Sequence, residues 1–193
     1  MSSFVIGVIY FVGAMTALMQ LLLVFFIIAT ISSADLREWL HERLGRHGVL
    51  VALTIVGGSI VGSLFFSEVA QFPACFLCWI ERALMYPEII LFGWYLYKPH
   101  KSLLYTALAM SVAGFLVSGY QILLENGSAP DLIPCTTLIS LVSCATKYIN
   151  LFGFLTIPVM AITVFAALIA VLIVVLHRKH WLPRKAAKYA HLS

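Results

Sequence analysis

Residues 75–97 read CFLCWIERALMYPEIILFGWYLY, a Cys-x-x-Cys pair followed directly by an apolar run from Trp79 to Tyr97. That run has the length of a membrane-spanning helix, because roughly 20 helical residues cross the hydrocarbon core. Four further runs of this kind lie at about 4–30, 49–66, 103–124 and 151–176. The sequence therefore predicts an all-α integral membrane protein with five spans.

The composition favours the same class. Of the 193 residues, 62% are hydrophobic and only 10% are charged, whereas about a quarter of the residues of a soluble domain are charged. So little polar surface cannot cover a water-soluble globule, and membrane lipid must therefore cover much of the chain. The net charge of +4 comes from residues that flank the apolar runs and form no continuous patch, so we expect no nucleic-acid partner.

The basic residues predict the orientation in the membrane. Ten of the twelve follow the first, third or last apolar run: Arg37, Arg43, Arg46, Lys98, Lys101, Arg178, Lys179, Arg184, Lys185 and Lys188. The positive-inside rule places these segments and the C-terminus in the cytoplasm, and the connections 67–78 and 125–150 outside. Those two connections hold all four cysteines. Disulfides persist outside the cytoplasm, so the arrangement is typical of a bacterial cytoplasmic (inner) membrane protein with extracytoplasmic redox loops.

The chain divides into four parts: an N-terminal transmembrane helix at 1–32, a surface segment at 33–48, a four-helix domain at 49–176 and a basic cytoplasmic tail at 177–193. Within 33–48, apolar residues fall on one helical face, with Trp39 suited to the lipid headgroups. This pattern favours a short helix on the cytoplasmic surface over a solvated linker. Gly58 and Gly62 form a small-xxx-small pair, which predicts close packing of the second apolar run against another helix.

Cys75 and Cys78 stand where the outer connection enters the third apolar run. A helix N-terminus lowers the pKa of a thiol, and Arg82 follows Cys78 by four residues, on the same helical face. The sequence therefore predicts that Arg82 stabilises a Cys78 thiolate or a negatively charged acceptor beside it, since a charged residue inside a span marks a functional site. The alternative is a structural disulfide with Arg82 extended toward the headgroups. All six histidines lie on the predicted cytoplasmic side, so only the four cysteines could bind zinc, and we expect no metal.

Two further polar features leave alternatives open. Cys135 and Cys144 enclose eight residues, and this spacing fits a redox-active pair and a loop staple equally well. Glu88 lies near the middle of the third run, where a buried carboxyl could relay protons or could make a polar packing contact with Tyr120 or Gln121.

Two stretches of the sequence resemble the DsbB/BdbC family of quinone-linked disulfide-bond-forming membrane oxidoreductases. PACFLCWIER at 73–82 with MYP at 85–87 is similar to the first active-site region of that family. Pro134-Cys135 and Cys144, followed by GFLTIP at 153–158, resemble the second outer loop and final helix of the BdbC-like branch. The resemblance covers roughly residues 49–176, so the first span is additional to the four-helix pattern of the family.

The resemblance implies a four-helix bundle and an electron relay. Cys135 would form the mixed disulfide with a reduced thioredoxin-fold (DsbA-like) partner, and Cys144 would be its companion. The pair Cys75 and Cys78 would reoxidise them and pass two electrons to a membrane quinone, ubiquinone or menaquinone. Cys78, Arg82, Trp79 and Tyr86 would contact the quinone. The histidine that many members carry before the second loop has no counterpart in this chain.

Two other functions compete with this one. Vitamin K epoxide reductases also couple loop cysteines to a CxxC beside a quinone, but there the loop pair precedes the CxxC, whereas here the CxxC comes first. A disulfide-stapled membrane scaffold without catalysis is the other alternative. It predicts disulfides that resist mild reductant and an Arg82 whose loss affects stability alone.

Overall fold

The computed structural model describes residues 3–32, 34–130 and 143–189. These residues form five helices and no β-strand, apart from one isolated bridge between Leu151 and Leu155. The helices are α1 (Ser3–Ser32), α2 (Ala34–Leu64), α3 (Phe76–Tyr97), α4 (Lys101–Glu125) and α5 (Ile157–Tyr189), and a π-helical turn, η1 (Phe65–Val69), follows α2. The predicted all-α class is confirmed.

Four helices contain segments long and apolar enough to cross a membrane, at Ser3–Thr30, His47–Val69, Lys101–Glu125 and Ile157–His177. The helix α3 has 22 residues but carries Glu81, Arg82 and Glu88 within them. The two carboxyl groups are buried against α4 rather than facing lipid. We therefore treat α3 as a fifth span whose charged residues face the interior of the protein.

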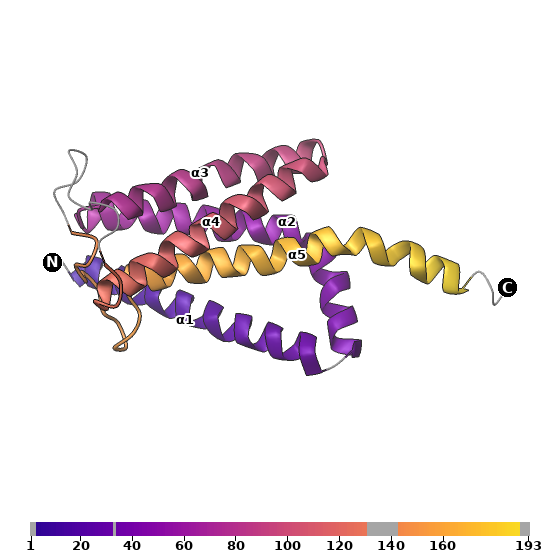
Figure 1. Ribbon diagram of the computed structural model, residues 1–193, viewed down its shortest axis with the longest axis horizontal. Coiled ribbons are helices and arrows are strands. Elements are labelled where there is room, and N and C mark those ends of the chain that lie inside the picture. The colour runs from indigo at the N-terminus through magenta and orange to yellow at the C-terminus, as the bar shows by residue number, and fades with distance from the viewer. Residues whose placement is uncertain (1–2, 33, 131–142, 190–193) are drawn as a thin grey trace.

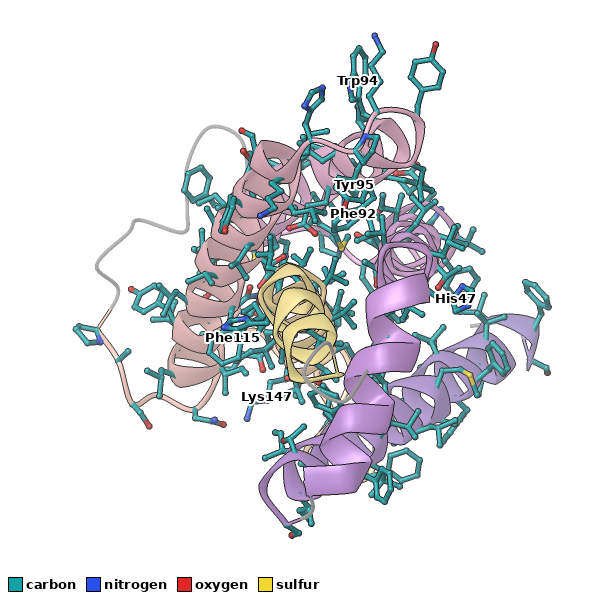
Figure 2. The ribbon with its side chains drawn as sticks, turned by 90° about the vertical axis from the view of Figure 1, so that its right-hand side faces the viewer. His47, Phe92, Trp94, Tyr95, Phe115 and Lys147 are labelled. Atoms are coloured by element: carbon teal, nitrogen blue, oxygen red, sulfur yellow. The ribbon has the colours of Figure 1, made fainter. Side chains whose placement is uncertain are left out.

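The helices α2, α3, α4 and α5 form the four-helix bundle. α5 packs against α4 and α2, and α3 packs against the same two helices, so the four close around a common core. Figure 2 shows α5 end-on, with α4 on one side and α2 on the other. Phe92, Phe165 and Leu168 fill the core and are almost fully buried, whereas Trp94, only two residues after Phe92, points away from the bundle.

Three side-chain hydrogen bonds fix the register between α3 and α4. Ser111 donates to Glu88, and Ser118 donates to Glu81. Gln121 donates to Cys78. The spacings of seven and three residues are the same on both helices and run in opposite directions, as antiparallel neighbours require. This register places Gln121 beside the cysteine pair.

The helix α1 lies outside the bundle and packs against α2 and α5. Figure 1 shows it close to the other helices at its N-terminal end and diverging from them toward Ser32. Most of its large side chains are exposed, including Phe4, Phe11 and Leu21, as expected for a helix that faces lipid. The structure thus has the predicted four-helix bundle with one additional N-terminal helix.

Two local predictions concern residues 34–47 and the pair Gly58 and Gly62. Residues 34–47 are helical and continuous with α2, and Figure 1 shows these first turns at a steep angle to the rest of the helix. Their location at the membrane surface stays a prediction. The predicted close packing of Gly58 and Gly62 against another helix is wrong, because a Cβ atom at either position would meet nothing within 4 Å.

The two connections that hold the cysteines meet at one end of the bundle. Phe66 and Phe72, near the end of α2, pack with Tyr148, Leu151 and the first turns of α1. Figure 1 shows these segments at the end where the chain begins. The turn between α3 and α4 and the C-terminus lie at the opposite end.

Candidate active site

Cys75 and Cys78 lie at the first turn of α3. Cys75 is the N-cap residue, with an extended backbone (φ −75°, ψ 173°), and its sulfur accepts a hydrogen bond from the backbone N–H of Cys78 at 3.4 Å. The two Sγ atoms are 2.9 Å apart and both cysteines are free thiols. An N-cap side chain satisfies one of the unpaired N–H groups of the first helical turn, so the start of α3 holds the first sulfur in place.

Cys75, the first cysteine of the pair, has a lowered pKa. The hydrogen bond from the Cys78 side chain, assisted by backbone N–H groups at the helix start, lowers the pKa of Cys75 from 9.0 to about 7 despite its burial. Cys75 occupies the capping position, toward which the N–H donors of the helix start point. The stabilisation by Arg82 of a Cys78 thiolate, or of a negatively charged acceptor beside it, stays a prediction.

Gln121 on α4 is a site residue that the sequence did not identify. Its Nε2 atom lies 3.4 Å from the Cys75 sulfur and 3.5 Å from the Cys78 sulfur, and the side chain is only 3% exposed. Its Oε1 atom is buried without a hydrogen-bond partner among the described residues. In the sequence, the only indication of this role was a glutamine one helical turn before the end of the apolar run at 103–124.

Arg82 is held by α2. Nε donates to the Ser63 hydroxyl at 3.0 Å, and Nη2 donates to the Ser63 carbonyl at 3.2 Å. The guanidinium also lies 5.3 Å from the centroid of the Trp79 ring, within cation–π range. Among the hydrogen bonds of the described residues, none joins Arg82 to either sulfur. The sulfurs instead share a hydrogen bond with each other and accept hydrogen bonds from the Gln121 amide and the Cys78 backbone.

Two predicted polar contacts have other partners. Glu88 accepts a hydrogen bond from Ser111 at 2.8 Å, so the alternative that paired it with Tyr120 or Gln121 is wrong. The Tyr120 hydroxyl donates instead to the carbonyl of Pro130. The prediction assumed the wrong register between α3 and α4. Tyr120 and Gln121 lie more than two turns along α4 from Ser111, beyond the reach of Glu88.

A cavity of about 800 Å³ adjoins the cysteine pair. Its polar end is lined by Cys75, Cys78, Glu81, Arg82 and Gln121. The rest of the lining is mainly apolar and comes chiefly from α1, α2, η1 and α5, with further residues from the connection before α3, from Glu125 and from the segment 143–148. This volume lies within the range of ~300–1,000 Å³ that is usual for small-molecule sites.

Of the four residues predicted to contact the cofactor, two line the cavity and two do not. Cys78 and Arg82 line the cavity, whereas Trp79 and Tyr86 are not among its lining residues. Trp79 is half exposed beneath the Arg82 guanidinium. Tyr86 packs against the bundle core, and its hydroxyl has no hydrogen-bond partner among the described residues.

The second cysteine pair is represented by Cys144, which is disulfide-bonded and buried. It packs in one cluster with Cys75, Leu77 and Leu124, and it also lines the cavity. Cys135 lies outside the described residues. The structure therefore brings one cysteine from each of the two cysteine-containing connections into one buried group, although about 70 residues separate them in the sequence.

The described residues contain no group of three or more histidine, cysteine, aspartate or glutamate side chains arranged to hold a metal ion. The candidate chemistry of these residues is therefore that of sulfur, amide, guanidinium and carboxyl groups. A thiol with a lowered pKa, a second thiol in contact with it and a nearby disulfide are the components of thiol–disulfide exchange.

Known proteins resemble this chain over the same region. The family described as "Disulfide bond formation protein DsbB" matches residues 45–175. "Probable disulfide formation protein C 2" of Bacillus anthracis is 32% identical over 127 residues, which cover 66% of this chain and 89% of that protein. "Probable disulfide formation protein C" of Halalkalibacterium halodurans is 36% identical over 131 residues, covering 67% and 90%.

"Disulfide bond formation protein C" of Bacillus subtilis is 34% identical over 111 residues, covering 58% of this chain and 79% of that protein. No solved structure shows a significant match to the chain. The matched family region contains all four cysteines and the whole four-helix bundle core, and it begins after α1. The chain belongs to the DsbB family of disulfide bond formation proteins, which are membrane disulfide oxidoreductases.

Proposed function

We propose that this protein reoxidises an extracytoplasmic thioredoxin-fold (DsbA-like) protein and passes the electrons through Cys75 and Cys78 to a membrane quinone. One observation carries the proposal: the sulfurs of the CxxC pair and Cys144 line the same cavity, whose remaining walls are mainly apolar. An apolar chamber beside a dithiol suits an acceptor that dissolves in the membrane.

The first step is exchange between the partner and the loop pair, which we assign as Cys135–Cys144. A thiolate of the reduced partner attacks one sulfur of this disulfide, and the second partner thiolate resolves the mixed disulfide. The partner dissociates in its oxidised form, and the loop pair retains the two electrons as two thiols. Resemblance to the family assigns the mixed disulfide to Cys135.

The second step is exchange between the two pairs of this chain. A thiolate of the loop pair attacks an oxidised Cys75–Cys78 disulfide, after which the loop disulfide re-forms and Cys75 and Cys78 carry the two electrons. The clustering of Cys144 with Cys75 supports a direct transfer between them.

The residues around the cavity fit a quinone. A bound quinone supplies an acceptor for two electrons and two protons. Arg82, oriented by Ser63, presents positive charge beside Cys78, where an acceptor oxygen would be stabilised. Gln121 Oε1, which is buried and unpaired among the described residues, could accept a hydrogen bond from a ring hydroxyl. Ring oxygens are common to ubiquinone and menaquinone, so these contacts suit either.

The orientation in the membrane belongs to the same proposal. The end of the bundle with the cysteines carries few basic residues, whereas the segments at the opposite end carry most of the lysines and arginines. This charge distribution supports an extracytoplasmic cysteine end and a cytoplasmic C-terminus. The thioredoxin-fold partner would then meet the loop pair outside the cytoplasm.

A turnover assay tests the proposal. The protein is purified in detergent and mixed with a pre-reduced thioredoxin-fold protein and a soluble quinone, and loss of quinone absorbance is followed. Turnover should be abolished by Cys78→Ser and by Cys135→Ser and retained by the control Ser102→Ala, at the opposite end of the bundle. Absence of turnover in the wild type with every quinone and partner, with its disulfides intact, would contradict the proposal and favour a stapled scaffold.

A further inference from the structure

The helix α1 lies outside both the bundle and the matched family region, yet it forms one wall of the cavity at the cysteines. We propose that α1 and the glycine-rich face of α2 together bind the isoprenoid tail of the quinone. This inference rests on the proposed function and adds to it a tail site that is built in part by α1.

The lining residues of α1 form one face of the helix. They recur every three or four positions, the spacing of a single helical face: Val8, Phe11, Val12, Met15, Thr16 and Met19. The face is apolar apart from Thr16, whose hydroxyl is already bonded to the carbonyl of Val12. A face of this kind offers van der Waals contact and no free polar group, which suits a hydrocarbon chain.

The opposite wall contains three glycines of α2. Gly57, Gly58 and Gly62 line the cavity, and a Cβ atom at any of them would meet nothing within 4 Å. These glycines therefore open space beside α1 instead of drawing two helices together. Larger side chains at these positions would occupy the cavity itself.

Contacts along α1 fix its position. Near its start, Val5 and Ile9 pack in a cluster with Leu151 and Leu155, and Gly13 lies directly against Leu151. Further along, Gln20 donates a hydrogen bond to Thr163 of α5 at 2.9 Å. The lining residues alternate with these contact positions along the same turns of α1, so this wall is defined by the fold.

The distribution of polarity identifies the occupant. The thiols, Glu81, Arg82 and Gln121 gather at one end, and the cavity continues from them between α1, α2 and α5 past Met19, Thr54 and Val164. A ligand with a polar redox-active ring and a long apolar tail matches this pattern in both parts. A phospholipid acyl chain matches only the apolar part, because it brings no group that Cys78 could reduce.

The test compares quinones that share one ring and carry no tail or isoprenoid tails of increasing length. For the wild type, KM should fall as the tail lengthens. Met15→Trp fills the α1 wall, and Gly58→Leu fills the α2 wall. Each should raise KM for the long-tailed quinone by roughly tenfold, because filling either wall removes apolar contact with the tail. The ratio of KM values between tail-less and tailed quinones should therefore approach one.

Leu18→Trp is the matched control, because Leu18 is exposed on α1 and does not line the cavity. It should retain the dependence of KM on tail length. Unfolding temperatures in detergent identify a variant that fails to fold, and the two walls provide independent variants.

Unchanged tail dependence in folded Met15→Trp and Gly58→Leu would overturn the inference while leaving the proposed function intact. An equal rise in KM for tail-less and tailed quinones would also overturn it, because the α1 face would then shape the ring site. Failure of the wild type to reduce any quinone would instead remove the proposed function, and the tail site with it.

Discussion

Ser63 on α2 accepts two hydrogen bonds from Arg82 on α3, one through its hydroxyl at 3.0 Å and one through its backbone carbonyl at 3.2 Å. A guanidinium presents its N–H donors in one rigid plane, so two bonds to a single residue fix the orientation of that plane. Arg82 and Cys78 both line the cavity. Ser63 thus acts as a positioning residue for the positive charge of the candidate active site.

Ser63→Ala should raise the quinone KM by up to roughly tenfold, because a hydrogen bond to a charged group contributes ~1.5–3 kcal/mol and the backbone carbonyl remains as a second acceptor. Arg82→Ala should have a larger effect. Ser67→Ala, at a serine whose hydroxyl bonds to its own preceding turn, is the control and should match the wild type. Steady-state kinetics of the single and double variants provide the measurement. Fully additive effects of Ser63→Ala and Arg82→Ala would contradict the positioning role.

The reactivity of Cys75 should depend on Cys78 in a pH-dependent way. The Cys78 hydrogen bond lowers the pKa of Cys75 to about 7, so much of the Cys75 thiol is ionised at neutral pH. Cys78→Ala removes this donor, and the pKa should rise toward its ordinary value of 9.0. The rate of Cys75 alkylation at neutral pH should then fall roughly tenfold, whereas above the ordinary thiol pKa the two proteins should react alike.

The rate is measured by mass spectrometry of the Cys75 peptide after timed exposure to iodoacetamide. Both proteins carry Cys135→Ser and Cys144→Ser, so that no loop thiol competes. If the two alkylation profiles have the same midpoint, the Cys78 hydrogen bond does not set the Cys75 pKa.

Replacing Gln121 by leucine should lower the activity of the protein without lowering its stability. Gln121→Leu keeps the approximate volume but removes the amide donor to both sulfurs, so the thiolate loses stabilisation and turnover should fall. The same change also removes a buried Oε1 atom that has no partner among the described residues, so the unfolding temperature should stay constant or rise. Turnover and thermal unfolding of one purified variant test both expectations. A parallel loss of activity and stability would indicate a purely structural role.

The architecture was predictable because its signals are local in the sequence. Each span is marked by a run of mainly apolar residues, and the common end of the cysteine connections follows from counting spans between basic segments. The CxxC at the start of α3 was visible for the same reason, since a cysteine before an apolar run occupies the N-terminus of a helix. These features need no knowledge of how the helices pack.

The parts that the sequence did not reveal depend on the register between helices. Gln121 meets the cysteines, and Ser111 meets Glu88, because α3 and α4 align in one antiparallel register. No local pattern fixes that alignment. The glycines of α2 were misread for a related reason: small residues permit both close packing and open space, and only the position of α1 decides between them.

The interface between α4 and α5 offers a stability test that is independent of redox chemistry. Gly114 is buried where the Phe165 ring approaches α4 so closely that an added Cβ atom would overlap the ring. Phe165 is 1% exposed in the bundle core, so its ring has little room to move. Gly114→Ala should therefore destabilise the protein by ~1–3 kcal/mol, the usual cost of overpacking a core.

Gly93→Ala is the matched control, because a Cβ atom at Gly93 on α3 would meet nothing within 4 Å. Alanine has a higher helix propensity than glycine by about 1 kcal/mol, so this control should leave stability unchanged or raise it. Thermal unfolding in detergent measures both variants. Phe165→Leu should relieve part of the clash, making the Gly114→Ala/Phe165→Leu double variant more stable than the sum of the single changes predicts. Equal unfolding temperatures for Gly114→Ala and Gly93→Ala would show that the α4–α5 interface is looser than this packing requires.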